Sequence, residues 1–324
     1  MGIPTHRRHL PTLQGLRALA CLLVVLYHAQ QVQFGEAAIA AWPNLSAGVD
    51  IFFVLSGFVM ALATKDMVPN RRTAMAFWRS RAARIVPLYW GLTLVKLATM
   101  RALPHAAAHT HPNAVNILAS FAFIPARDAA GVVRPVLAVG WTLNFEFFFY
   151  TLIAVALAAG RAPARVVPPV LIGLGMAGFW REPTWPAIAS LANGLMVEFA
   201  IGMAVFALWQ RGTITRLPGA ALLLLGFAAV LMLPLAGPWR GLVWGGAAGV
   251  MLAGALALDG RVRVPAMIVT LGDASYAIYL LHGFVMPVFG PVMGAVISVP
   301  AGVLLDRYID RPVLRFIMRR TQAA

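Results

Sequence analysis

The chain has 324 residues, of which 60% are apolar and 11% are charged, and its formal net charge at pH 7 is +15. A soluble globule of this length has too little interior to bury so much apolar surface, and the composition also excludes an intrinsically disordered chain. The only cysteine, Cys21, excludes a disulfide scaffold. The basic residues form short clusters between apolar runs, which is typical of membrane-protein loops and not of a nucleic-acid-binding face. We therefore expect a lipid bilayer around most of the chain and no nucleic-acid partner.

The first apolar run, at 16–33, follows a short basic N-terminus. The residues that end the run, Tyr27 to Gln30, make a poor signal-peptide cleavage site, so we expect a retained membrane span. Further runs suited to crossing about 30 Å of hydrocarbon as helices follow at 48–64, 85–103, 137–159, 166–180, 187–209, 217–236, 240–258, 266–289 and 291–307. The run 114–125 is too short to cross alone and is predicted to be re-entrant or interfacial. The sequence predicts an all-α polytopic bundle of about ten spanning helices plus one short helix.

Lysine and arginine give the orientation of this bundle. With the N-terminus in the cytoplasm and 104–136 outside, the inside segments carry 18 of these residues and the outside segments carry 4. An excess of positive charge is typical of cytoplasmic loops. The sequence therefore predicts a multi-pass protein with a cytoplasmic N-terminus.

Two ionisable residues on the first span are candidates for chemistry. Arg17 lies near the cytoplasmic end, and His28 follows eleven residues later, about 16 Å further along a helix. A cation at the mouth can hold a phosphate, and a neutral imidazole deeper in the membrane is suited to general-base work. The alternative is a buried histidine that only hydrogen-bonds a backbone carbonyl.

Acids occur in other spans, and further cations occur in the loop before the third span. Asp50 opens the second span from outside at a depth comparable to His28, where it either orients an imidazole or serves as an N-terminal helix carboxylate. Arg81 and Arg84 lie three residues apart, so they either clamp a phosphate or are ordinary positive charges on the inner side. Glu146 begins its span among aromatic residues and is too deep to be a solvated surface charge.

The remaining candidates are weaker. Glu198 resembles Glu146 in its setting, and His282 lies deep in a late span, either facing the same cavity or packing in the bundle. His105, His109 and His111 cluster in an outer loop with a spacing that zinc accepts, but no further ligand accompanies them, so we expect no metal site.

Several of these segments together resemble the acyltransferase family 3 of multi-spanning membrane O-acyltransferases. The matching segments are Arg17 with ten residues before His28, GVDIFFVLSGF at 48–58, RAAR at 81–84 running into IVPLYW, WTLNFE at 141–146 and SYAIYLLH at 275–282. The likest branch acetylates exopolysaccharides and lipopolysaccharide sugars. The resemblance implies acyl-CoA as the cytoplasmic donor, an essential histidine matching His28, and arginines that hold the CoA end. It also implies a carbohydrate hydroxyl as acceptor, on the outer side or on a lipid-linked intermediate.

From the residues and the resemblance we expect one integral-membrane acyltransferase domain over 1–324, with no soluble extension, in a bacterial-type inner membrane. We expect His28, Asp50 and Glu146 to be catalytic, and Arg17, Arg81 and Arg84 to bind the donor, which we expect to be acetyl-CoA. The expected acceptor-binding residues are Trp141, Asn144, Tyr276 and His282. The alternative function is a transporter or flippase for a lipid-linked sugar, in which buried His, Asp and Glu form a proton relay.

Overall fold

The computed structural model describes residues 10–35, 45–102, 111–233 and 237–323. Its α-helices are α1 (Pro11–Phe34), α3 (Gly48–Thr64), α4 (Arg71–Ala102), α5 (Ala114–Phe121), α6 (Trp141–Ala158), α7 (Pro163–Ala177), α8 (Met196–Gln210), α9 (Gly219–Met232), α10 (Arg240–Leu258), α11 (Ala266–Phe289), α12 (Pro291–Leu305) and α13 (Arg311–Ala323). Within these described ranges, the one strand-like pairing is an isolated bridge between Arg127 and Val133. The all-α prediction is confirmed.

Eight helical segments of the described chain are long and apolar enough to cross a membrane, and each matches one of the predicted spans. The two other predicted spans lie in α9, which has 14 residues, and in the C-terminal part of α4. α4 begins at Arg71, well before the expected residue 85, because the basic segment 71–86 contains no glycine or proline and continues the helix. The short run 114–125 contains α5, which has eight residues. Apolar runs therefore identified the spans but not the charged extension of a span.

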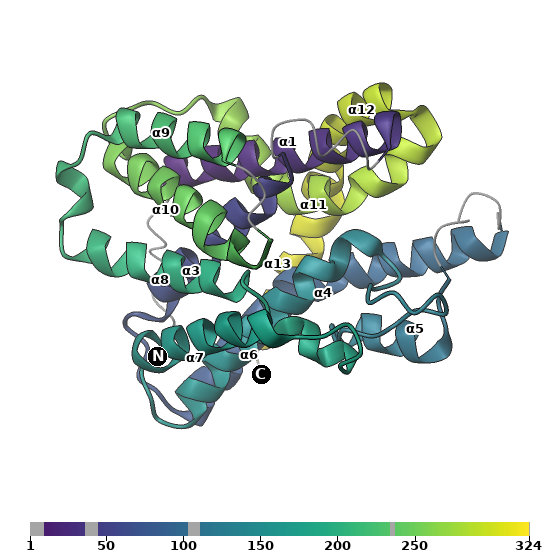
Figure 1. The fold of residues 1–324 in the computed structure, drawn as a ribbon, viewed down its shortest axis with the longest axis horizontal. Coiled ribbons are helices and arrows are strands. Elements are labelled where there is room, and N and C mark those ends of the chain that lie inside the picture. The colour runs from purple at the N-terminus through teal and green to yellow at the C-terminus, as the bar shows by residue number, and fades with distance from the viewer. Residues whose placement is uncertain (1–9, 36–44, 103–110, 234–236, 324) are drawn as a thin grey trace.

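Helices from distant parts of the sequence pack together. α1 contacts α3, α11 and α12, while α8 packs against α3, α7 and α10. Figure 1 shows α1, α11 and α12 on one side of the molecule and α4, α6 and α7 on the other. This arrangement brings into one region of the bundle the segments that carry the family resemblance, which lie on α1, α3, α4, α6 and α11.

The crossing of α3 and α8 depends on two glycines. A Cβ atom on Gly57 would overlap the backbone of Phe199, and one on Gly202 would overlap the Val54 carbonyl oxygen. Membrane helices lack a hydrophobic driving force for association, so close backbone approach through small residues is a main source of their packing energy. The two glycines therefore fix the position of α3.

We expect Gly202→Ala to lower the free energy of unfolding by about 3 kcal/mol, because the added methyl group forces the α3 and α8 backbones apart. Thermal unfolding of the purified protein in detergent measures this effect. Gly246 of α10 is the matched control, since a Cβ there meets open space. Gly246→Ala should leave the unfolding temperature unchanged or slightly raised. Equal destabilisation by the two variants would contradict this account of the crossing.

The C-terminal helices form one continuous rod. The predicted span 291–307 corresponds to α12, and a π-helical turn at 306–310 joins it to α13. Asp306 and Asp310 in this turn are both buried, and they pair with Arg311 and Arg84 respectively. The turn thereby fixes the C-terminal end of the rod against α4.

Candidate active site

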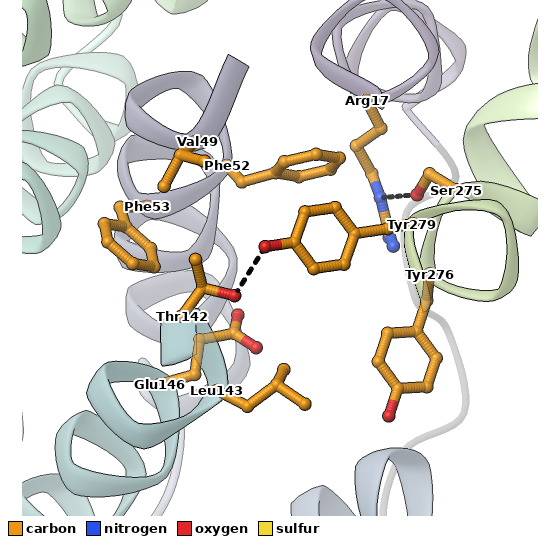
Figure 2. Close-up of a pocket in the computed structure, with 10 residues that line it drawn as sticks. All are labelled: Arg17, Val49, Phe52, Phe53, Thr142, Leu143, Glu146, Ser275, Tyr276 and Tyr279. Carbon is orange, nitrogen blue, oxygen red and sulfur yellow. Dashed lines mark hydrogen bonds between the residues drawn. The ribbon is translucent and has the colours of Figure 1, made fainter. Parts of the chain in front are cut away.

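A cavity of about 90 Å³ lies among four helices. Its lining comes from α1, α3, α6 and α11 and consists of Arg17, Val49, Phe52, Phe53, Thr142, Leu143, Glu146, Ser275, Tyr276 and Tyr279. Figure 2 shows the Tyr279 phenol reaching toward Thr142, between the arginine and the carboxylate. The cavity is therefore mostly apolar, with one cation and one acid.

Hydrogen bonds hold both charged groups of the cavity. The Arg17 Nε–H donates to Ser275 Oγ over 3.3 Å. Glu146 Oε1 accepts hydrogen bonds from Ser56 Oγ at 3.1 Å and from Tyr150 Oη at 3.2 Å. Hydroxyl groups from α3 and α6 thus orient the carboxylate, and a hydroxyl group from α11 orients the guanidinium. Tyr150 could have been expected from the sequence, because it lies one turn after Glu146 on the same helix face; Ser56 on α3 carried no such signal.

His28 lies next to His282, beyond the cavity lining. Their ring centroids are 4.8 Å apart, and the His282 centroid is 5.8 Å from that of the cavity residue Tyr279. A path of ring contacts therefore joins the cavity to His28 through Tyr279 and His282. Neither His28 nor His282 is among the residues that line the cavity with Arg17.

The hydrogen bonding of His28 defines the tautomer of its ring. Its Nδ1 lies 2.9 Å from the Val24 carbonyl oxygen. A carbonyl only accepts, so Nδ1 carries the proton and the lone pair of a neutral ring is on Nε2. The buried ring of His282 makes no well-formed hydrogen bond within the described chain, although the Ile278 and Tyr279 carbonyls lie nearby.

Asp50 lies in the first turn of α3, which is the N-terminal helix position that was one of its two expected settings. It is fully buried, and its Oδ2 is 2.7 Å from Arg240 Nη2. Arg240 also lies over the Trp244 ring, and Glu198 is close to both charged groups. Both carboxylate oxygens of Asp50 accept hydrogen bonds from Arg240 on α10. Sequence reasoning counted Arg240 only as an outer loop charge, because its partner is 190 residues away.

The predicted donor-binding arginines gather near the cavity, but Arg84 already has a partner. Its Nη1 is 2.9 Å from Asp310 Oδ2, and its guanidinium lies 5.6 Å from the Tyr276 ring centroid. Arg81 lies over the Phe77 ring and interacts electrostatically with Glu146. Arg17 interacts electrostatically with Arg84 and Glu146. Arg17 and Arg81 thus lie near the half-buried Glu146 carboxylate, and Arg84 lies near Arg17.

The other predicted site residues divide into two groups. Tyr276 lines the cavity and donates to the Ile85 carbonyl oxygen over 2.7 Å. Trp141 packs against Phe53 and Phe145, and neither it nor the buried Asn144 lines the cavity.

The histidine cluster of the outer loop is only partly described. His111 is exposed, and His105 and His109 lie outside the described residues. In the part of the chain that the structure describes, no group of three or more His, Cys, Asp or Glu side chains is placed to hold a metal ion.

Comparison with known proteins gives matches along nearly the whole chain. The acyltransferase domain of family 3 matches residues 10–320. The chain is 35% identical to the exopolysaccharide production protein ExoZ of Rhizobium meliloti, over 90% of this chain and 95% of that protein. It is 27% identical to the acyltransferase MdmB of Streptomyces mycarofaciens, over 99% of this chain and 96% of that protein.

A third relative shares only part of its length with this chain. It is the peptidoglycan O-acetyltransferase OatA of Listeria monocytogenes, which is 27% identical over 52% of this chain and 28% of that protein. No solved structure matches.

Proposed function

We propose that this chain, which belongs to the acyltransferase family 3, moves an acetyl group from cytoplasmic acetyl-CoA to a hydroxyl group of an exopolysaccharide or of its lipid-linked precursor. The chain is a multi-pass membrane protein and an acyltransferase. The polysaccharide acceptor is supported by the relatives named for exopolysaccharide production and for peptidoglycan O-acetylation. Membership of an enzyme family favours this function over a transporter or flippase. We place the protein in a bacterial-type inner membrane with its N-terminus in the cytoplasm, as the distribution of basic residues indicates.

The observation that carries the proposal is the fixed tautomer of His28. With its Nδ1–H directed at the Val24 carbonyl, the ring offers Nε2 as a base. Nε2 removes the proton of the acceptor hydroxyl while that oxygen attacks the thioester carbonyl carbon. The C–S bond then breaks, CoA leaves as a thiolate, and the imidazolium returns the proton to sulfur. The alternative route, in which the imidazole first takes the acetyl group covalently, uses the same nitrogen.

The surrounding groups suit the donor. Arg17, Arg81 and Arg84 would hold the phosphates of CoA, since guanidinium groups bind phosphate through paired hydrogen bonds. Glu146 keeps Arg17 directed into the cavity and balances the cluster when no donor is bound. In this role Glu146 is a positioning residue, and Asp50 positions α3 through Arg240.

The size of the cavity implies movement during donor binding. About 90 Å³ holds an acetyl group or a few water molecules, but not the pantetheine arm. The donor must therefore displace side chains, and the bond between Arg84 and Asp310 is one contact in its way. A phosphate group would replace the Asp310 carboxylate as the partner of Arg84.

The proposal is tested with purified protein, radiolabelled acetyl-CoA and de-O-acetylated exopolysaccharide, for which we expect label in the polymer and an equal amount of free CoA. In the same assay, Arg84→Ala should raise the KM for acetyl-CoA about tenfold and change kcat less, because it removes a charged contact to the donor. Arg216→Ala, which alters an exposed cytoplasmic cation outside this cluster, is the control. An unchanged KM in Arg84→Ala would contradict the donor site, and absence of transfer by the unmodified protein would contradict the function.

A further inference from the structure

A second cavity, of about 260 Å³, lies between two loops at one end of the bundle. One loop follows α5 and contributes Arg127 and Val133, and the other follows α7 and contributes Arg181, Glu182 and Trp185. None of these residues takes part in the acetyl-transfer site described above.

The two loops are at the end of the bundle where α1 terminates. Phe179 contacts Trp239 just before α10, and Arg240 donates to the Ser46 carbonyl just before α3. His28 lies in the last third of α1, toward the same end. The second cavity and the proposed catalytic base therefore belong to the same half of the molecule, which is the outer half in the proposed orientation.

Hydrogen bonds and an ion pair hold the two loops that form the second cavity. The Arg127 guanidinium donates to the Gly131, Pro183 and Trp185 carbonyls, which ties the two loops together. Asp128 is buried and binds Arg134 at 2.7 Å. Burial alone would raise the pKa of Asp128, but Arg134 and the Val132 and Ala130 amides hold that pKa below its ordinary value, so the carboxylate stays charged at pH 7. These bonds preform the cavity.

The lining has the chemistry that recognises a sugar. A pyranose ring has apolar C–H faces and hydroxyl edges. A site that binds it therefore offers a flat apolar surface together with groups that donate and accept hydrogen bonds. Trp185, which is 41% exposed, supplies the flat apolar surface. Arg181 donates and Glu182 accepts. The two arginines outnumber the single acid, which favours a sugar unit that carries negative charge.

We propose that the second cavity is a subsite for the carbohydrate acceptor, where it holds one sugar unit of the polymer apart from the unit that is acetylated. This inference rests on the proposed function. Binding at such a remote subsite contributes affinity for a long acceptor without taking part in the chemistry. A short acceptor that reaches only the catalytic histidine gains nothing from it.

The test compares Trp185→Ala with Trp180→Ala, a nearby tryptophan that is 69% exposed and does not line the cavity. Acetyl transfer is measured to de-O-acetylated exopolysaccharide and to an oligosaccharide of one repeat unit. We expect Trp185→Ala to raise the KM for the polymer about tenfold, the loss typical of one aromatic anchor, with kcat and the KM for the oligosaccharide unchanged. Trp180→Ala should change each value less than twofold. The same behaviour in both variants would overturn the subsite.

A binding experiment separates this inference from the proposed function. Calorimetric titration of the purified protein with the same polymer needs no acetyl donor, and Trp185→Ala should weaken binding about tenfold. Binding that depends on Trp185 without any acetyl transfer would reject the function and keep the subsite. Transfer that is indifferent to Trp185 would reject only the subsite. Loss of binding to phosphatidylglycerol vesicles, with polymer binding intact, would show a lipid-headgroup site and overturn the proposal.

Discussion

Replacing His28 with alanine is expected to lower acetyl transfer to the polysaccharide about a thousandfold, the loss typical of removing a general base. His28 is half-buried, and its Nδ1–H already has a partner, so Nε2 is the nitrogen that can act on a hydroxyl group. Transfer of radiolabel from acetyl-CoA to the polymer measures the effect. Both the direct route and the route through an acetyl-imidazole require this nitrogen, so both predict the same loss.

His282 provides the comparison for this variant. Its ring is fully buried, 4.8 Å from that of His28, and a positioning role predicts a smaller loss in His282→Gln than in His28→Ala. His282→Gln should also shift the pH profile of kcat, because the neighbouring ring is part of the environment of the base. A role in packing alone would lower the unfolding temperature and leave that profile unchanged. Activity of a folded His28→Ala protein equal to that of the unmodified chain would reject the mechanism.

Removing the charge of Asp50 is expected to have the largest effect on stability. Asp50→Ala leaves the Arg240 guanidinium without its partner inside the bundle, and breaking a buried ion pair in this way costs about 3–5 kcal/mol. Thermal unfolding in detergent measures the loss. The effect should exceed that of Asp66→Ala, because Asp66 pairs with Lys65 on the surface, where both side chains are exposed.

A double variant decides whether Asp50 acts on the structure or on the chemistry. Asp50→Asn combined with Arg240→Gln removes both charges and keeps hydrogen-bonding groups of similar shape, so it should regain much of the stability that Asp50→Ala loses. If Asp50 only positions α3, the double variant transfers acetyl groups at close to the normal rate. A stable but inactive double variant would instead support the catalytic role that the sequence suggested.

The membrane spans and the family could be predicted because their signals are local. A run of apolar residues is long enough to cross a bilayer whatever its neighbours are, and its backbone hydrogen bonds are made within the helix. The start of α4 was placed too late because the prediction relied on this local apolar signal. Hydropathy does not detect a helix whose first part is basic, such as the segment from Arg71 to Arg84.

His28, Asp50, Glu146 and His282 lie on helices at the predicted spans, whereas Arg81 and Arg84, expected in a loop, lie within α4. For His28, the two environments that the sequence left open apply to different nitrogens of the ring. Nδ1 has the carbonyl contact expected of a structural histidine, and Nε2 is the nitrogen we propose as the base. The Val24 carbonyl lies one helical turn before His28, so this contact is local.

By itself, therefore, the sequence determined that the protein is a helical membrane bundle, which apolar spans carry His28, Asp50, Glu146 and His282, and which family the motifs resemble. Only the tertiary structure decided the partners of those groups: Asp310 for Arg84 and Arg240 for Asp50, each about 200 residues away. It also decided that His282 adjoins His28 and that neither histidine lines the cavity that Arg17 lines. Such pairings depend on how the helices cross and rotate against each other, and side-chain packing between distant segments sets both.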